Sequence, residues 1–366
     1  MNVDTPLGER LRRLIAADGP ISVAHYMAHC LGNPEHGYYR TRDPFGATGD
    51  FTTAPEISQM FGELIGLWTA AVWRQMGAPE RIALIELGPG RGTLMADALR
   101  AVAVVPAFRQ AVDVHLVETS PPLRDRQRAM LNERGRPLTW HDDLAQTPDS
   151  PSIVIANEFF DALPVFQAVR ADDGWHERMV GLDHQGRLAF GLNPTVLSGF
   201  EHVLPPALAG AAPGAVYEWR AGTEAEKICR RLVAHGGAAL IVDYGHTESG
   251  FGDTLQAVRA HRFVDLLSTP GEADLTAHVD FAALARAAKQ SGIAAHGPMT
   301  QGDFLRCLGI EARAERLKHN AAPAQANAID AALARLTGHG PGQMGAPFKA
   351  LALAPSALGP LPGFDT

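Results

Sequence analysis

The sequence predicts an α/β fold of the Rossmann-like kind, in which short buried strands alternate with helices. Residues 82–87 form an apolar run typical of a strand that is buried on both faces. The run ends in a glycine-rich turn at residues 88–92, and the stretch that follows has apolar residues at helical spacing. Further apolar runs at residues 112–117 and 153–156 continue the alternation, which is typical of a parallel sheet.

Composition limits the function classes. The chain has 366 residues, of which 46% are hydrophobic, so we expect one large or two modest domains with real cores. The formal net charge is -8 and there is no long Lys/Arg run, which disfavours a nucleic-acid role. Cys30, Cys229 and Cys307 are too few and too scattered for a disulfide framework or a zinc knuckle, so a reducing compartment is expected.

We expect no membrane insertion, because no apolar run approaches the roughly 20 residues of a membrane helix. The start of the chain does not resemble a signal peptide, and Asp4, Glu9 and Asp18 argue against an acid-poor transit peptide. A bacterial cytoplasm is therefore the predicted location.

The first elements are helical. Residues 5–32 predict two helices separated by Gly19-Pro20, and Ser22 is suited to cap the second. His25 and His29 lie one turn apart, but no third ligand has matching spacing, so no metal site is predicted. The turn-rich stretch 43–59 is either a plain loop or a lid over a site, and residues 57–76 form an amphipathic helix.

The glycine spacing after the first strand indicates the ligand. Thr93 stands where a dinucleotide fingerprint would have its third glycine. An acidic residue, Glu86, lies just before the first glycine of the series, Gly88. The resulting E-x-G-x-G-x-G pattern resembles motif I of the S-adenosylmethionine-dependent methyltransferases; the alternative is a tight turn without a ligand. The cofactor-binding residues predicted here are Glu86, Gly88, Pro89, Gly90, Gly92 and Thr93.

Acidic residues follow the next two strands. Glu118 ends the strand at residues 112–117 and could accept both ribose hydroxyls of a bound nucleoside, unless it is simply a surface carboxylate. A helix should begin at Ser120-Pro121. After a short strand at residues 138–140, Asp142 or Asp143 could meet the adenine amino group, although either could equally cap a helix.

The strand at residues 153–156 runs into Asn157, Glu158 and Asp161, which we expect on the substrate side of the site. Ligands of open parallel sheets bind beyond the carboxyl ends of the strands, near the point where strand order reverses. Asn157 would lie beside both the cofactor and the substrate.

The rest of the chain predicts inserted elements around a continuing sheet. Short alternating runs from residue 164 to about 220 indicate an antiparallel β insertion. Thr223 and Glu226 predict a capping box, and residues 238–242 the fifth strand. A helix follows from Asp280 to Gly292, residues 301–337 are predicted to be helical, and residues 348–352 form a closing strand.

Five stretches in order along the chain are together similar to the MidA family of methyltransferases, whose mitochondrial members are complex I assembly factors. They are Gly49 to Glu63, Glu86 to Leu94, Asn157 to Pro164, Asp243 to Gly245, and Leu275 to Phe281. The resemblance implies a seven-stranded methyltransferase sheet with S-adenosylmethionine as methyl donor. It also implies a protein substrate, an arginine of a core subunit of respiratory complex I that is dimethylated symmetrically. Residues 1–78 would then be an N-terminal helical segment with a lid loop. Residues 79–366 would be the methyltransferase domain, with a β insertion at about 164–220 and a helical insertion at about 302–345.

The chemistry of that acceptor suggests roles for the carboxylates. A guanidinium is a cation that pairs bidentately with carboxylates, so Glu158 and Asp161 could orient it if their peptide is helical, with Glu56 closing over them. Alternatively, Asp161 caps a helix and Glu158 faces water. At the level of the whole protein, the alternatives are a nicotinamide-dependent oxidoreductase and a non-catalytic assembly factor that binds the methyl donor. The sequence does not indicate an oligomeric state.

Overall fold

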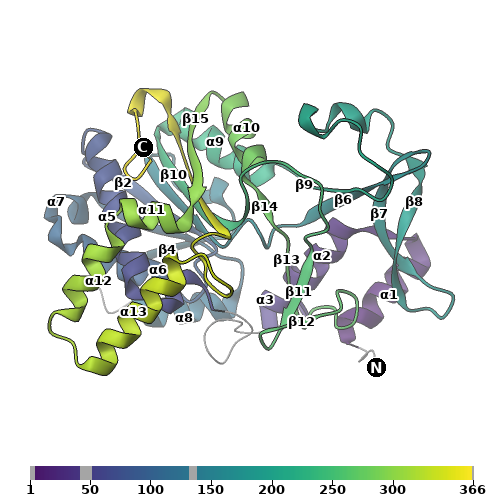
Figure 1. Cartoon of the computed structure of the whole chain (residues 1–366), viewed down its shortest axis with the longest axis horizontal. Coiled ribbons are helices and arrows are strands. Elements are labelled where there is room, and N and C mark those ends of the chain that lie inside the picture. The colour runs from purple at the N-terminus through teal and green to yellow at the C-terminus, as the bar shows by residue number, and fades with distance from the viewer. Residues whose placement is uncertain (1–4, 42–51, 132–137, 365–366) are drawn as a thin grey trace. The chain divides into compact units, whose positions relative to one another are not determined.

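The computed structural model describes residues 5–41, 52–131 and 138–364, which divide into two compact units (Figure 1). The sheet unit comprises Thr52–Phe160, Gly222–Thr247 and Phe281–Thr366. The N-terminal unit comprises Met1–Phe51, Asp161–Ala221 and Glu248–Asp280. Gly49, Asp50 and Phe51, which belong to the first MidA-like stretch, and Asp4 lie outside the described residues.

The core of the sheet unit is a mostly parallel sheet. Seven strands follow one another in the order β15-β16-β10-β5-β2-β3-β4. Their bounds are β2 Ile82–Leu87, β3 Val112–Val117, β4 Leu138–His141, β5 Ser152–Asn157, β10 Gly237–His246, β15 Ile293–Thr300 and β16 Phe348–Pro355. All six residues of β2 are buried, as expected of a central strand covered on both faces. The predicted Rossmann-like methyltransferase sheet is confirmed.

Strand order reverses beside β2. From β2 the chain builds outward through β3 and β4, then returns to add β5 and β10 on the other side of β2, all parallel. β16 runs antiparallel between β10 and β15. The carboxyl ends of β2 and β5 therefore meet at the switch point, where ligands of such sheets bind.

Helices accompany this sheet. They are α4 Ala54–Ile57, α5 Gln59–Gln75, α6 Thr93–Ala101, α7 Pro106–Ala111, α8 Pro121–Leu131, α9 Thr223–His235, α10 Phe281–Gln290, α11 Gln301–Cys307, α12 Ile310–Lys318 and α13 Pro323–Thr337. α5 packs closely on α6 because a Cβ at Gly66 would lie 2.6 Å from Ala98 Cα. Figure 1 shows α12 and α13 side by side as a hairpin within the predicted helical stretch 301–337.

Two local predictions need correction, and one strand was not predicted. The stretch of helical spacing after the glycine turn, from Leu94 to Val105, does not form one helix: α6 ends at Ala101, and α7 begins at Pro106, which cannot continue a helix because it has no N–H. The N-cap of α9 is Gly222 and not Thr223, so the predicted capping box is absent. β15 was not predicted. By contrast Ser22 caps its helix as expected, accepting from the His25 N–H at 3.1 Å.

The N-terminal unit combines helices with antiparallel strands. Its helices are α1 Pro6–Asp18, α2 Val23–Gly32 and α3 Tyr38–Thr41. One sheet has the order β1-β7-β6-β9 with β8 beside β7, and a smaller one the order β12-β11-β13. The bounds are β1 Ile21–Ser22, β6 Val165–Ala171, β7 Gly174–Leu182, β8 Leu188–Val196, β9 Val216–Arg220, β11 Gln256–Arg259, β12 Arg262–Val264 and β13 Asp274–Thr276. The apolar faces of α1 and α2 share a core with Val165 and Val180.

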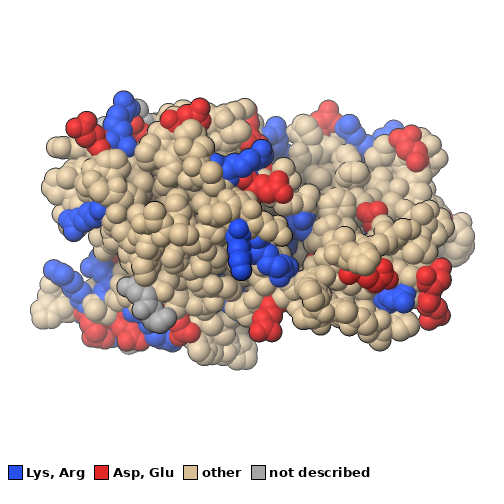
Figure 2. Space-filling model, turned by 90° about the horizontal axis from the view of Figure 1, so that it is seen from above, with Lys and Arg blue, Asp and Glu red and all other residues tan. Residues whose placement is uncertain are grey.

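The surface is of mixed charge. On the face that Figure 2 shows, basic and acidic side chains are interspersed among uncharged ones. Within the part of the chain that the structure describes, no helix combines the length and the apolar character needed to cross a bilayer.

Candidate functional site

The glycine loop between β2 and α6 adopts backbone conformations that favour glycine. Gly88, Gly90 and Gly92 have φ of 60°, 55° and 86°. A Cβ on Gly88 would lie 2.9 Å from Phe159 Cδ2, so a side chain there would collide with the peptide after β5. The turn closes when the Gly92 N–H donates to Pro89 O at 2.8 Å, and Gly92 then caps α6. The loop thus presents the start of α6, with Thr93 as its first residue, to a ligand.

Glu118 follows β3 and is buried. Its Oε1 accepts from the Ser120 N–H at 2.8 Å, and its Oε2 accepts from Gln127 Nε2 at 3.3 Å. Burial raises the pKa of this carboxyl, and the Ser120 and Gln127 hydrogen bonds oppose that rise. The carboxylate is therefore held at the strand end where the ribose role was predicted.

Sequence reasoning missed Gln127 as a site residue. It lies on α8 and is fully buried; its Nε2 also donates to Gly90 O at 2.7 Å, and its Oε1 accepts from Trp140 Nε1 at 2.8 Å. A signal was available. Leu123, Gln127 and Leu131 are four residues apart, so an amide interrupts an apolar stripe.

The two aspartates after β4 have different partners. Asp142 is exposed and pairs with Arg124 Nη2 at 2.6 Å. Asp143 caps the short 3-10 helix Leu144–Gln146 by accepting from the Ala145 N–H at 2.8 Å, and it also pairs with Lys227. Asp143 thus caps a helix, which was the alternative given for it. Contact of Asp142 or Asp143 with adenine stays a prediction.

Two buried polar atoms at the switch point have no partner among the described residues: Glu86 Oε2 on β2 and Asn157 Oδ1 at the end of β5. Burial raises the pKa of Glu86 to about 8. Buried polar atoms are almost always hydrogen-bonded, so water or a polar group of a ligand is expected at these two. An ammonium group would suit both acceptors and would lower the pKa of Glu86.

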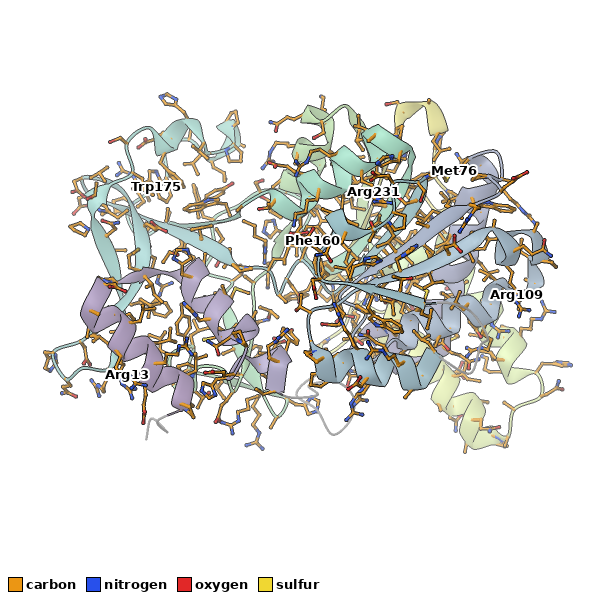
Figure 3. All side chains as sticks on the ribbon, turned by 180° about the vertical axis from the view of Figure 1, so that it is seen from behind. Arg13, Met76, Arg109, Phe160, Trp175 and Arg231 are labelled. Atoms are coloured by element: carbon orange, nitrogen blue, oxygen red, sulfur yellow. The ribbon has the colours of Figure 1, made fainter. Side chains whose placement is uncertain are left out.

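The peptide after β5 is fixed by hydrogen bonds from elsewhere in the sheet unit. Asp243, at the end of neighbouring β10, accepts through Oδ2 from the N–H groups of Phe159 and Phe160 at 3.1 and 2.8 Å. Figure 3 labels Phe160 where the chain leaves the sheet. Glu158 has a φ of 49°, a left-handed conformation that costs a non-glycine residue of order 1–3 kcal/mol. Such strain is frequent at functional sites.

This peptide is not helical, so the geometry that would have placed Glu158 and Asp161 on one helix face is wrong. Asp161 also caps no helix. It belongs to the N-terminal unit, where its carbonyl oxygen accepts from the Ala277 N–H at 3.1 Å and from Arg220 Nη2 at 3.3 Å. Burial raises the pKa of the Asp161 carboxyl to about 6 although the charge of Arg220 opposes it.

Residues 53–57 link the two loops. The Ala54 N–H donates to Glu158 Oε1 at 2.8 Å, and Asn157 Nδ2 donates to the same oxygen at 3.2 Å. Glu56 accepts from the Thr93 hydroxyl, and its Oε2 lies 3.7 Å from Arg91 Nη1. Glu56 therefore contacts the start of α6, and it is Ala54 that contacts Glu158.

At the amino end of β5, away from the carboxyl ends of the strands, Arg231 supports the sheet and not the site. It reaches from α9 (Figure 3), and its guanidinium donates to Ser152 Oγ and Thr147 Oγ1, both at 2.8 Å. The described residues of the site thus form one group at the carboxyl ends of β2, β3 and β5: the glycine loop, Glu56, Glu86, Glu118 and the Asn157–Glu158 pair. A nucleoside with a cationic amino-acid tail fits this donor and acceptor set.

Known proteins resemble the chain over most of its length. A sequence model of a family of S-adenosyl-L-methionine-dependent methyltransferases matches residues 64–299. The mitochondrial protein arginine methyltransferase NDUFAF7 homolog of Drosophila melanogaster is 39% identical over 386 residues, covering 96% of this chain and 85% of that protein. Human mitochondrial NDUFAF7, named a protein arginine methyltransferase, is 38% identical, covering 85% of this chain and 75% of its own.

A solved structure extends the similarity to the fold. A Burkholderia thailandensis protein bound to S-adenosyl-homocysteine superimposes with a TM-score of 0.85 and 29% identity, covering 99% of this chain and 97% of that one. None of these comparisons supports the nicotinamide-dependent alternative.

The predicted bacterial cytoplasmic location is wrong by the same comparisons, because the relatives from Drosophila and human are mitochondrial proteins. The prediction depended on the cysteine count, on the lack of a signal-peptide pattern and on three acidic residues near the start of the given sequence, and these features do not determine a compartment.

Proposed function

Because the chain belongs to this family of S-adenosyl-L-methionine-dependent methyltransferases, we propose that it methylates arginine side chains of a protein substrate. The names of the relatives support the acceptor class. The site supports it through chemistry: a guanidinium cation requires a fixed carboxylate, and Glu158 supplies one at the switch point.

The held carboxylate of Glu158 is the observation that carries the proposal. Its Oε1 accepts from the Ala54 N–H and from Asn157 Nδ2, so its direction is set before any acceptor arrives. The left-handed backbone at Glu158 turns the chain sharply as it leaves β5. A preorganised carboxylate costs little reorganisation when it binds a cation.

When bound, S-adenosylmethionine supplies a methyl carbon activated by a sulfonium. The glycine loop, Glu118, Glu86 and Asn157 would hold that donor through their acceptors and the start of α6. Glu158 would hold the acceptor guanidinium so that one of its nitrogens lies in line with the breaking carbon–sulfur bond. That nitrogen would take the methyl group as the carbon–sulfur bond breaks, leaving neutral S-adenosylhomocysteine, and would release one proton to water. Alignment of this kind contributes several kcal/mol.

The proposal keeps two further predictions from the sequence. Asp161 is proposed to help bind the acceptor, and Asp142 or Asp143 to contact the adenine amino group. Glu56 would fix the start of α6 beside the donor through Thr93.

The direct test is Glu158→Gln in a methyl-transfer assay with labelled donor. The amide keeps the shape but removes the charge, so we expect methyl transfer to fall by about tenfold or more, in line with a charge-assisted hydrogen bond. Cofactor affinity should stay within about twofold of the wild-type value, since Glu158 acts on the acceptor. Glu80→Gln is the matched control, because Glu80 is an exposed glutamate of the same unit. Full activity with unchanged substrate affinity would remove Glu158 from the mechanism.

We further propose symmetric dimethylation of a core subunit of respiratory complex I, as the MidA resemblance implies. Purified protein, labelled donor and a lysate from cells that lack the gene should give one dominant labelled band, to be identified by mass spectrometry. Labelling of a complex I subunit at symmetric dimethylarginine is the expected result. Binding of the donor without any labelled band would favour the alternative of a non-catalytic assembly factor.

A further inference from the structure

We propose that Gln127 is a positioning residue for the cofactor, acting through Glu118 and Gly90 and not by direct contact with the donor. The inference depends on the proposed ribose role of Glu118. It concerns a helix, α8, that contributes none of the predicted site residues (Figure 1).

Gln127 joins two loops from different strands. Its Nε2 donates to Gly90 O at 2.7 Å, in the loop after β2, and to Glu118 Oε2 at 3.3 Å, at the end of β3. A side-chain amide has two N–H hydrogens, one for each acceptor. Gln127 thereby ties the glycine loop to the ribose carboxylate, beyond the β2–β3 pairing and the Gly88 N–H bond to Val117 O that bring the two strand ends together.

Trp140 fixes which way the amide points. Its Nε1 is 2.8 Å from Gln127 Oε1, and an indole nitrogen can only donate. The amide oxygen must therefore face β4, and the NH₂ group must face Gly90 and Glu118. Arg128, the next residue on α8, lies over the Trp140 ring at 4.9 Å and helps to hold the indole in place.

The arrangement keeps Glu118 suitable for its predicted task. A ribose diol donates two hydroxyl hydrogens, so its partner must be an ionised carboxylate that only accepts. Burial works against ionisation of Glu118, while the bonds from Ser120 and Gln127 favour it. Without Gln127 the carboxylate would take up a proton more easily, and Oε2 would lose the Gln127 hydrogen bond while Oε1 keeps the one from the Ser120 N–H.

A purely structural role is the competing explanation, and the same unit contains a matched residue for it. Gln301 is likewise fully buried, and its Nε2 donates to Leu336 O at 2.9 Å. It lies on α11, so its bond joins helical segments and no strand-end loop. Loss of either buried amide should therefore cost stability, but only one should change the cofactor site.

The experiment compares Gln127→Met and Gln301→Met in the full chain. S-adenosylhomocysteine affinity is measured by calorimetry at pH 6 and pH 8, and thermal unfolding is measured in the absence of ligand. Both variants should lose melting temperature, and Gln127→Met should lose more. It leaves three buried groups without their hydrogen bond, whereas Gln301→Met leaves one and removes an amide oxygen that has no partner among the described residues. Gln127→Met should bind at least about tenfold more weakly, as expected for a charge-assisted hydrogen bond and a displaced loop, while Gln301→Met stays within about twofold.

The pH dependence separates positioning from stability. Removing Gln127 raises the pKa of Glu118 further, so the affinity of Gln127→Met should fall more between pH 8 and pH 6 than that of the wild type. Trp140→Phe is the milder second variant, because it removes only the donor that orients the amide; we expect about threefold weaker binding. Wild-type affinity and pH dependence in both Gln127→Met and Trp140→Phe would overturn the inference alone. If the wild type did not bind S-adenosylhomocysteine, both the inference about Gln127 and the cofactor assignment would be overturned.

Discussion

Two loops at the same edge of the sheet are built in different ways. The glycine loop after β2 owes its shape to neighbouring residues, since Gly92 closes on Pro89 and three glycines adopt positive φ. The peptide after β5 owes its shape to distant residues: Asp243, 84 positions away from Phe159, and Ala54, 104 positions away from Glu158. The cofactor side can therefore be recognised from a short motif, whereas the acceptor side is assembled by the tertiary fold.

The largest effect should come from breaking the glycine loop. Gly88→Val adds a branched side chain where the first carbon already lies 2.9 Å from Phe159 and φ is 60°. We expect S-adenosylhomocysteine affinity to fall by more than about 100-fold, because the loop must move away from the ligand and the backbone is strained by about 1–2 kcal/mol. Calorimetry measures the affinity.

Gly77→Val is the control for strain alone. Gly77 has a φ of 86°, but a Cβ there would meet nothing within 4 Å. It should lose stability and keep its affinity. Equal losses of affinity in both variants would contradict a specific role for the space at Gly88.

The next effect should appear on the acceptor side. In Asp243→Asn, an NH₂ group must face either the Tyr244 N–H or the two N–H groups of Phe159 and Phe160, so at least one buried donor loses its partner. That loss costs about 1–3 kcal/mol. We expect methyl transfer to fall by about 30-fold, corresponding to about 2 kcal/mol, while cofactor affinity changes by less than about threefold.

Asp330→Asn provides the comparison for Asp243→Asn, since it changes an exposed aspartate of α13 that pairs with Lys318 on α12. It should leave methyl transfer unchanged. If Asp243→Asn lowered cofactor affinity as much as methyl transfer, the two loops would not be separable in function.

How much the sequence could predict follows the same division. Strand, glycine loop and helix are local, and Glu118 was found because parallel strands end at one edge. Gln127 was missed because its role depends on two acceptors brought together by the fold. The Glu158–Asp161 geometry was wrong because a left-handed residue after β5 and the hydrogen bonds of Asp243 prevent a helix there. The small sheet β12-β11-β13 also escaped prediction, since its strands have only three or four residues.

Glu86 on β2 provides a further test of the cofactor side, because it is buried and its Oε2 has no partner among the described residues. Its folded-state pKa of about 8 lies above the ordinary value, so the native protein binds an extra proton and loses stability as pH rises from about 4.5 to 8. Glu86→Gln removes this dependence. Relative to the wild type, it should gain on the order of 3–4 kcal/mol between pH 5 and pH 8 in denaturant titrations without ligand, since one pH unit per bound proton corresponds to about 1.4 kcal/mol.

The same variant should bind S-adenosylhomocysteine more weakly, since a neutral amide attracts an ammonium group less than a carboxylate does. Stability and affinity would then change in opposite directions, as is common at binding sites. If the difference in unfolding free energy between the wild type and Glu86→Gln were the same at pH 5 and pH 8, Glu86 would not be protonated in the folded protein.

The smallest effect tests the segment that joins the two loops. Glu56→Gln keeps an acceptor for the Thr93 hydroxyl but ends the ion pair with Arg91, whose nitrogen lies 3.7 Å away. A pair that is partly exposed contributes less than about 1 kcal/mol, so cofactor affinity should fall by no more than about threefold. Salt gives the decisive measurement. Because screening weakens only the wild-type pair, the difference in affinity between wild type and Glu56→Gln should shrink as ionic strength rises. A difference that does not depend on salt would mean that Glu56 fixes the start of α6 through Thr93 alone, and that residues 53–57 join the loops by hydrogen bonds and not by charge.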